Sequence, residues 1–497
     1  MLQLCWKFLS SDEQWASLCR AKYLRHGMPV NTYVKSSIWY GIKHHVSTVK
    51  ANTIWLIGSG QSVFFWTDNW LGTPLVYTLN VQHADPKFLT TKVAKFINHG
   101  RWRIPKSILE LDHTLGPQIN KIILPKEALD DRLIWTSSQD GLLNAKIAYF
   151  HLFPSTATVA WAVWIWHSFI PPSSSFVVWR ALHDRIPTDE NLIKRGCTVV
   201  SVCSLCLAGL ETTSHLFLSC SFAAQLWNWL GTMFENNFDC TNISSVFNSC
   251  KSSWSEHIYN LALAAITHVL HSIWMARNGI RFNNAKISLH AAKMKVLTAI
   301  AISNTLVTGF TALTETSILN RLQLKTRLHN APVISVVLWR APSVHWMKVN
   351  TDGSVTTLPP SAACGGVFRD HLVTFRGCFA KKLDTVLVLH AEVMAIILAI
   401  ETTHNNGWQN VWIESDSQAA LCAFGNHAVV PWSLRNRWHN CISLGLNLAS
   451  SHIFREGNTC ADRLANHGHS IIDFTWWNSL PQFLRGPFIN DKLGLPC

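Results

Sequence analysis

The sequence predicts an α/β domain at the C-terminal end of a 497-residue chain, preceded by a mainly helical region. Three observations carry this prediction. From Trp346 onward, strand-like and helical runs follow the order β-β-β-α-β-α-α-β-α. Acidic residues stand where several of these strands end and helices begin. Further upstream, cysteines and a histidine gather in one short stretch.

The α/β domain is expected at residues 342–475 as a mixed five-stranded sheet with flanking helices. Its predicted strands are 347–350, 365–368, 374–380, 411–414 and 451–454, and its strongest helix is 391–402. The stretch Arg340-Ala341-Pro342-Ser343 has the character of a linker before this domain. Residues 476–497 are expected to form a tail.

The upstream chain divides into three further parts by pattern. Residues 1–80 begin with helical spacing and continue with an expected hairpin, in which runs 53–57 and 62–66 are joined by a Gly-Ser-Gly-Gln turn. Residues 130–235 hold the cysteine cluster. Residues 240–340 are expected to be a helical linker, with the strongest helices at 254–277 and 291–306.

Composition and charge exclude a mostly disordered chain and suggest a polyanionic partner. The hydrophobic fraction is 48%, and 42 Lys+Arg face 29 Asp+Glu. Residues 342–497 contain 11 basic and 11 acidic residues, so the whole excess lies upstream, where 31 basic residues face 18 acidic ones. This distribution favours nucleic-acid binding by the upstream part, and the alternative is that the cations keep a Trp-rich chain soluble.

The cysteines and the apolar stretches indicate an intracellular protein. The 14 cysteines are dispersed along the chain, unlike a compact disulfide framework, so no disulfide-linked partner is expected. No secretory signal pattern opens the chain, and prolines, serines or histidines interrupt its longest apolar stretches. We therefore expect a nuclear or cytoplasmic protein with no membrane partner.

Four carboxylates are placed as a metal site would require. Asp352 closes the first predicted strand, Glu392 opens the following helix, Asp416 ends the next strand, and Asp462 lies on the last helix. Strand ends and helix starts at one edge of an α/β sheet converge. Any one of these acids alone would more often make a turn or a cap. Together they predict oxygen ligands for two divalent cations, which can activate a water and stabilise a leaving oxygen in phosphodiester hydrolysis.

These residues resemble the type 1 ribonuclease H domains, in the shortened form found in plants and in plant LINE-type retrotransposons. The matching pieces are Lys348-Val349-Asn350-Thr351-Asp352-Gly353-Ser354, Gly365-Gly366-Val367-Phe368-Arg369-Asp370, Ala391-Glu392, Glu414-Ser415-Asp416-Ser417, Arg455-Glu456-Gly457-Asn458 and Ala461-Asp462-Arg463-Leu464-Ala465. The resemblance implies that Asp352, Glu392, Asp416 and Asp462 bind two Mg²⁺ ions. It also implies cleavage of the RNA strand of an RNA·DNA hybrid.

Two features of the resemblance leave alternatives open. His452 lies ten residues before Asp462, where bacterial members of the family place a histidine that helps product leave, and a structural histidine is the alternative. Arg455 and Asn458 are expected to orient the turn or to touch phosphates. No basic, substrate-gripping protrusion is visible between Asp416 and Asp462, so hybrid affinity must come largely from the basic upstream part.

The Cys/His cluster has the spacing CX2CX8HX4C, formed by Cys203, Cys206, His215 and Cys220. Two cysteines two residues apart can place both sulfurs on one ion, and the later His and Cys complete a tetrahedral, structural Zn²⁺ site. The alternative is that these are buried small residues. Flanking motifs, among them Trp179-Arg180-Ala181-Leu182 and Lys194-Arg195-Gly196, resemble the zinc-binding region that follows reverse transcriptase in plant LINE-type elements.

Within residues 1–80, Ala21-Lys22-Tyr23-Leu24, Ser37-Ile38-Trp39, Ile57-Gly58-Ser59-Gly60 and Phe65-Trp66-Thr67-Asp68-Asn69-Trp70-Leu71-Gly72 resemble the segment that joins the polymerase to that zinc region. The polymerase itself is expected to be missing. Leu129-Asp130-Asp131-Arg132 lacks the aromatic residue of a polymerase Asp-Asp hairpin and is interpreted as structural. Two hypotheses follow. The chain is a Mg²⁺-dependent ribonuclease acting on hybrids, or it is a catalytically inactive, nucleic-acid-binding relic of a retrotransposon.

Overall fold

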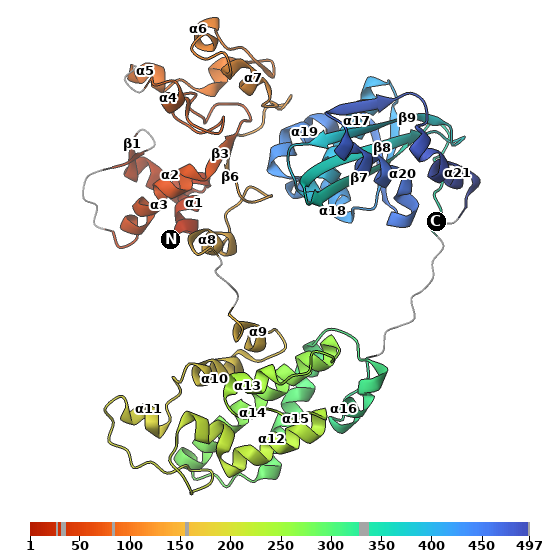
Figure 1. Cartoon of the computed structure of the whole chain (residues 1–497). Coiled ribbons are helices and arrows are strands. Elements are labelled where there is room, and N and C mark those ends of the chain that lie inside the picture. The colour runs from red at the N-terminus through yellow and green to blue at the C-terminus, as the bar shows by residue number, and fades with distance from the viewer. Residues whose placement is uncertain (26–27, 31–35, 82–84, 155–158, 328–336, 496–497) are drawn as a thin grey trace. The chain divides into compact units, whose positions relative to one another are not determined.

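The computed structural model describes residues 1–497 except 26–27, 31–35, 82–84, 155–158, 328–336 and 496–497 (Figure 1). The chain divides into two compact units. Met1–Pro154 together with Ile334–Cys497 form unit 1, and Ser155–Val333 form unit 2.

The C-terminal part of unit 1 is a mixed sheet with the strand order β11-β10-β7-β8-β9-β12. β7 (Met347–Thr357), β8 (Pro360–Arg369) and β9 (Phe375–Leu383) pair in antiparallel fashion. β10 (Asn410–Ser415) lies parallel to β7, and β11 (Asn447–His452) lies parallel to β10. The carboxyl ends of the parallel strands therefore meet at one edge of the sheet, where ligands bind in open α/β sheets.

Helices cover both faces of this sheet (Figure 1). Val349 and Phe368 point into a core shared with α17 (Val388–Asn405) and α19 (Arg435–Ile442). The neighbouring Val367 faces the opposite side, where it packs with α20 (Thr459–His467) and α21 (Arg485–Leu493). The alternation of buried side chains along β8 explains why its whole central run is apolar. Shorter elements complete this part: α18 (Gln418–Leu421), η4 (Cys422–Phe424), η5 (His427–Val429), η6 (Trp432–Leu434), η7 (Arg455–Asn458), η8 (Gly468–Ser470) and η9 (Gln482–Leu484).

The structure corrects the predicted strand number and the predicted tail. A sixth strand, β12 (Phe474–Trp477), pairs antiparallel with β9, and α21 follows it. The ring centroid of Trp476 lies 5.7 Å from that of Phe368, and a Cβ at Gly377 would collide with its indole. A four-residue edge strand has too little alternation to be told from a tail by pattern. The last parallel strand also begins earlier than predicted, at Asn447.

In the first part of unit 1, the predicted hairpin is wrong. β3 (Thr53–Leu56) pairs antiparallel with β6 (Arg132–Trp135) and not with residues 62–66. The carboxylate of Asp131 accepts the backbone N–H groups of Gly58, Gly60 and Ser62, each at 2.8 Å, and so holds the intervening turn. This supports the structural interpretation of Asp131. It also means that the region predicted to begin at residue 130 starts with a strand of unit 1.

The remaining elements of this first part are short and enclose two apolar cores. They are α1 (Leu2–Ser10), α2 (Gln14–Tyr23), β1 (Leu24–Arg25), β2 (Met28–Pro29), α3 (Trp39–Ala51), α4 (Leu75–Thr78), α5 (Pro86–Leu89), η1 (Val93–Phe96), β4 (Ile97–Asn98), β5 (Arg101–Trp102), α6 (Lys106–Leu109), α7 (Leu115–Asn120) and α8 (Ala145–Leu152).

Unit 2 is helical and is built around one core. That core runs without interruption from Trp164 to Leu322, so the boundary predicted near residues 235–240 does not separate two cores. Residues 240–322 are therefore packed structure and not a linker. The elements are α9 (Ala162–Ile165), α10 (Pro172–Leu182), α11 (Asp189–Ile193), η2 (His215–Ser219), α12 (Ser221–Phe234), α13 (Ile243–Asn248), α14 (Glu256–Asn283), α15 (Leu289–Leu306), η3 (Leu313–Glu315) and α16 (Thr316–Arg321).

The long helix α14 is apolar enough, by length and composition, to cross a membrane. In unit 2 it is the central core helix, and 67% of its most apolar window is buried against neighbouring elements. A buried core helix of this kind satisfies the same length and composition test as a membrane span. Its hydrophobicity is therefore accounted for by packing inside unit 2.

Candidate metal centres

Three of the four predicted carboxylates meet at the edge of the sheet. Asp352 lies on β7, one residue beyond the segment that pairs with β10; Glu392 lies in the first turns of α17; and Asp416 directly follows β10. One oxygen from each lies within 4.8 Å of one oxygen from each of the others. The parallel register of β7 and β10 is what brings Asp352 and Asp416 to the same level.

Two glycines let helices approach the strands closely enough to deliver the acids. A Cβ at Gly353 would lie 2.5 Å from the backbone nitrogen of Glu392, so α17 can sit at this point of β7 only because residue 353 has no side chain. On the opposite face, a Cβ at Gly365 would lie 2.6 Å from the Leu464 Cβ and 2.8 Å from the Ala465 nitrogen on α20. Gly365 faces Asp352 across the β7–β8 ladder.

We expect Gly365→Ala to destabilise the protein by about 1–3 kcal/mol, because α20 must move away from β8 to admit the methyl group. Asp462 would move with α20, so the apparent Mg²⁺ affinity should fall as well. Urea unfolding and Mg²⁺ titration check the two effects. Gly486→Ala is the matched control, since nothing lies within 4 Å of the added Cβ there. Equal behaviour of the two variants would contradict the packing argument.

The electrostatics of the cluster are those of acids crowded without a cation. Burial raises the pKa of Glu392 to about 9, and repulsion by Asp352 and Asp416 adds to the effect. Burial and the neighbouring charges of Asp416 and Asp462 raise the pKa of Asp352 to about 8. The buried Glu392 Oε2 has no hydrogen-bond partner within the described part of the chain. An unpartnered carboxylate oxygen beside two others is the donor set that a hard divalent cation prefers.

The raised pKa values predict that metal-free protein loses stability as pH rises. The folded chain keeps protons on Asp352 and Glu392 up to pH ~8–9, whereas the unfolded chain releases them near their ordinary values of 3.8 and 4.5. Between these limits the folded state binds more protons, so the free energy of unfolding falls with increasing pH. Mg²⁺ should reverse most of this loss at pH 8. Urea unfolding at pH 5, 6.5 and 8, in chelator or in Mg²⁺, measures it, and a flat metal-free profile would contradict it.

The fourth acid, Asp462, lies beside the cluster and is engaged elsewhere. Its Oδ1 accepts from Arg455 at 3.2 Å and its Oδ2 accepts from Asn466 at 3.0 Å. Its charge nevertheless contributes to the raised pKa of Asp352. Arg455 is 78% exposed, so its guanidinium is free to turn toward an incoming anion. His452 is exposed at the end of β11, where its ring lies edge-on to Phe454.

Buried polar residues behind the acids form a support that the sequence did not reveal. The Lys348 ammonium pairs with Glu414 at 2.9 Å, although both side chains are almost fully buried. Asn458 donates to Asp416 Oδ1 at 3.1 Å and to the Thr351 carbonyl at 3.0 Å. The sequence predicted that Asn458 orients the turn or touches phosphates. In the structure it also bonds directly to one of the three clustered acids.

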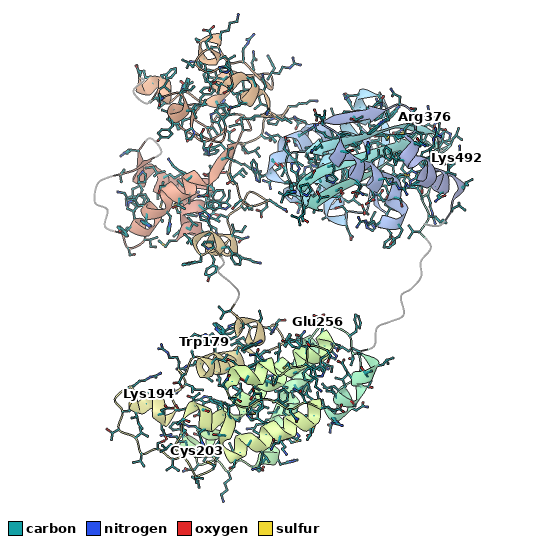
Figure 2. The ribbon with its side chains drawn as sticks, in the orientation of Figure 1. Trp179, Lys194, Cys203, Glu256, Arg376 and Lys492 are labelled. Atoms are coloured by element: carbon teal, nitrogen blue, oxygen red, sulfur yellow. The ribbon has the colours of Figure 1, made fainter. Side chains whose placement is uncertain are left out.

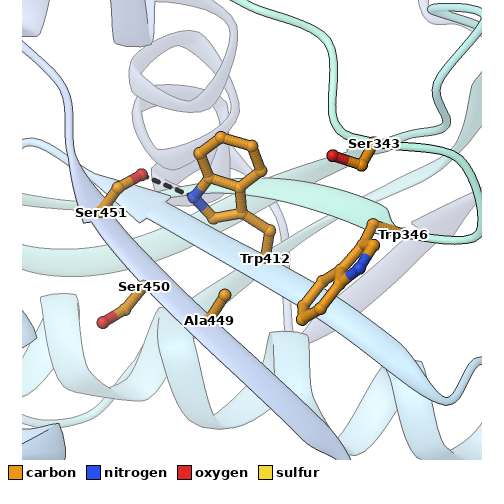
Figure 3. Close-up of a pocket in the computed structure, with 6 residues that line it drawn as sticks. All are labelled: Ser343, Trp346, Trp412, Ala449, Ser450 and Ser451. Carbon is orange, nitrogen blue, oxygen red and sulfur yellow. Dashed lines mark hydrogen bonds between the residues drawn. The ribbon is translucent and has the colours of Figure 1, made fainter.

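A shallow pocket of about 280 Å³ lies along β10 and β11 (Figure 3). Its lining residues are Ser343, Trp346, Trp412, Ala449, Ser450 and Ser451. The Trp412 indole donates to Ser451 Oγ at 2.6 Å, and the Lys348 ammonium lies 4.3 Å from its ring centroid. Because its six lining residues include no acid or base, this pocket is separate in chemistry from the carboxylate cluster.

The four predicted zinc ligands come together in unit 2, where Figure 2 labels Cys203. The Sγ atoms of Cys203 and Cys220 are 3.8 Å apart, and Cys206 Sγ lies 3.2 Å from His215 Nε2. Two sulfurs each ~2.3 Å from one tetrahedral Zn²⁺ would lie about 3.8 Å apart. The thiol of Cys203 donates to Cys220, and this hydrogen bond together with burial raises the pKa of Cys203 to about 12. The same hydrogen bond lowers the pKa of Cys220, against the opposite effect of burial.

The loop that carries the cluster is fixed to the core helix α14 by buried charges. Glu211, between Cys206 and His215, accepts from the Arg277 guanidinium through both carboxylate oxygens. Asp189 pairs with Arg281 on the same helix. Breaking one partner of a buried pair costs several kcal/mol because the other charge stays buried. The Cys/His cluster is therefore attached to the central core helix of unit 2 and is not a free loop.

Comparison with known proteins gives two family matches and one long relative. A model described as zinc-binding in reverse transcriptase matches residues 144–227, and a model described as reverse transcriptase-like matches residues 350–468. A curated protein of Arabidopsis thaliana, provisionally named a ribonuclease H protein, is 24% identical over 481 residues. That alignment covers 92% of this chain and 74% of the relative.

Solved structures with likeness to the chain include ribonucleases H. RNase H1 from the archaeon Halobacterium salinarum is 22% identical, with 25% of this chain and 96% of that chain covered and a TM-score of 0.22. LC11-RNase H1 in complex with an RNA/DNA hybrid is 23% identical, with 25% and 96% covered and a TM-score of 0.23. The foamy viral protease-reverse transcriptase in complex with an RNA/DNA hybrid is 17% identical, with 32% and 27% covered and a TM-score of 0.23.

Proposed function

We propose that this retrotransposon-derived protein with a ribonuclease H-like domain is a Mg²⁺-dependent endonuclease that hydrolyses the RNA strand of RNA·DNA hybrids. One observation carries the proposal. Asp352, Glu392 and Asp416 come from three different elements and meet within 4.8 Å at the edge where the parallel strands end. Such crowding is costly without a cation, so it favours a metal centre over three unrelated turn or cap residues.

Asp352, Glu392 and Asp416 are the residues that would hold two Mg²⁺ ions through carboxylate oxygens, with Asp462 completing the set. When bound, the ions supply an activated water and stabilise the leaving oxygen in phosphodiester hydrolysis. The chain itself positions these groups: α17 and β7 bury Glu392 and Asp352, and Asn458 bonds to Asp416. Arg455 is exposed beside Asp462 and offers a cation for a backbone phosphate.

Hybrid recognition in this proposal is shared between the two regions of the chain. The ribonuclease H-like domain would distinguish RNA from DNA by contacts to 2′-hydroxyl groups across a wide minor groove. The upstream region, with 31 basic and 18 acidic residues, would supply phosphate neutralisation. Cys203, Cys206, His215 and Cys220 would hold one structural Zn²⁺, since four ligands leave no open coordination position.

The second candidate function is nucleic-acid binding without catalysis. It is favoured by Asp462, whose two oxygens are taken by Arg455 and Asn466 and not turned into the cluster. A relic that keeps the fold would bind hybrids through the basic region and would leave them intact. The two candidates therefore differ in turnover and not in affinity.

The deciding experiment uses the full chain, Mg²⁺ and an end-labelled RNA·DNA hybrid, with single-stranded RNA and duplex DNA as controls. The endonuclease proposal expects cleavage of the RNA strand only, and loss of cleavage in Asp416→Asn. Tight hybrid binding with no product, unchanged in Asp416→Asn, would establish the inactive relic instead. His452→Ala distinguishes the two interpretations of that histidine, because a role in product release predicts slower turnover with unchanged hybrid binding.

A further inference from the structure

A chain of buried polar side chains connects the C-terminal helix α21 to the carboxylate cluster. Asp491 on α21 pairs with Arg369 on β8, and Arg369 donates to Asn350 Oδ1 on β7 at 2.7 Å. Asn350 donates in turn to Asn458 Oδ1 at 3.1 Å, and Asn458 donates to Asp416 Oδ1. Arg369 and Asn350 are 0% exposed and Asn458 is 1% exposed, so water does not compete for these bonds.

The direction of the hydrogen bonds along this series of side chains is fixed at its Arg369 end. An arginine can only donate, and the Trp339 indole can only donate, and both bond to Asn350 Oδ1. The Asn350 amide must therefore present its NH₂ group to Glu414 and to Asn458. Asn458 must then accept through its oxygen, which leaves its own NH₂ group for Asp416 and for the Thr351 carbonyl.

The opposite orientation of Asn458 would be unfavourable at the site. A turned amide would place its oxygen against the Asp416 carboxylate and against a backbone carbonyl, in a buried region where such contacts are costly. Arg369 thus needs to stay in place, and two groups hold it there. Asp491 neutralises its charge, and the Trp339 ring lies 3.8 Å from its guanidinium carbon.

We propose that α21, through Asp491 and Arg369, sets the orientation of the Asn350 and Asn458 amides and thereby positions Asp416 for metal binding. The inference rests on the proposed function, because it concerns the same carboxylate cluster. It assigns Asp491, Arg369, Asn350 and Trp339 as positioning residues. It also gives α21, which lies beyond the predicted domain boundary at residue 475, a role in positioning the metal ligands.

The test measures Mg²⁺ affinity of the full chain by calorimetry, without nucleic acid. The double variant Arg369→Met/Asp491→Leu removes both charges while keeping apolar volume, so no unpaired charge stays buried. We expect the Mg²⁺ dissociation constant to rise by ~10-fold or more, as for other groups that orient metal ligands. Glu401→Gln is the matched control, because it breaks another arginine–carboxylate pair, with Arg437, that has no bond to this chain of side chains.

A milder variant keeps the inference testable if the double variant does not fold. Trp339→Phe keeps the ring over Arg369 but removes one of the two donors to Asn350, and we expect a smaller loss of Mg²⁺ affinity. Folded variants that bind Mg²⁺ as the parent does would overturn the inference alone. A parent protein that binds no Mg²⁺ would overturn the proposed metal centre itself. An equal loss in Glu401→Gln would show general destabilisation and would also overturn the inference.

Discussion

Asp352→Asn is expected to reduce hybrid cleavage by at least about 1000-fold, equivalent to about 4 kcal/mol of transition-state stabilisation. Asp352 shares its surroundings with Glu392 and Asp416, and its oxygen lies within 4.8 Å of theirs. An amide offers one neutral oxygen in place of a charged carboxylate, so it would hold a divalent cation less well. The chemical step should therefore be lost even where the hybrid still binds.

The same substitution should leave folding intact and should stabilise the metal-free protein above pH 7. Burial and like charges raise the pKa of Asp352 to about 8, so its ionised form is unfavourable in the folded state. Removing that charge removes repulsion with Asp416 and Glu392. A gain in stability when an acid is removed is expected where the acid serves chemistry and not packing.

Cleavage of labelled hybrid and thermal unfolding, both on the full chain, measure the two effects. Asp384→Asn is the matched control, because Asp384 is an exposed acid of the same domain outside the cluster. Retention of substantial cleavage by Asp352→Asn would remove this residue from the metal centre. Loss of cleavage together with unfolding would instead indicate a structural role for the carboxylate.

The carboxylate cluster was predictable because its members follow from local patterns. Asp416 directly follows β10, and Asp352 lies one residue beyond the part of β7 that pairs with β10, so the parallel pairing brings both acids together. The support behind them was not predictable, because its bonds join distant residues. Asn350 and Asn458 are 108 positions apart, and Arg369 and Asp491 are 122 positions apart. The spacing of apolar residues along the sequence carries no information on which buried polar groups will form hydrogen bonds with each other.

The errors in the fold have a similar origin. Residues 53–56 have a good strand pattern, but their partner is 132–135 and not the run after the adjacent turn. The Gly-rich turn that suggested a hairpin is instead held by Asp131, far along the chain. In unit 2 the helices 254–277 and 291–306 were recognised by period: α14 begins two residues later than predicted, at Glu256, and α15 contains the second predicted helix. Their packing into one core with the cysteine region depended on tertiary contacts.

Cys203→Ser is expected to remove zinc from the protein and to lower the thermal unfolding temperature of unit 2. Cys203 and Cys220 are 0% exposed and are part of the unit's apolar core, so the proposed metal lies against that core. With free zinc about a thousandfold above its dissociation constant, binding would stabilise the folded unit by about 4 kcal/mol. For a unit of this size, that corresponds to a fall of about 10 °C when binding is lost.

Metal analysis should find about one zinc per chain in the parent and a large loss in Cys203→Ser. The matched control is Cys197→Ser, because Cys197 is exposed in the same region and lies outside the four-residue cluster. A chelator should lower the unfolding temperature of the parent and of Cys197→Ser but leave that of Cys203→Ser unchanged, since the variant has no zinc to lose. Freshly reduced parent protein with almost no zinc would refute the site. Chelator sensitivity that persists in Cys203→Ser would mean that other ligands hold the metal.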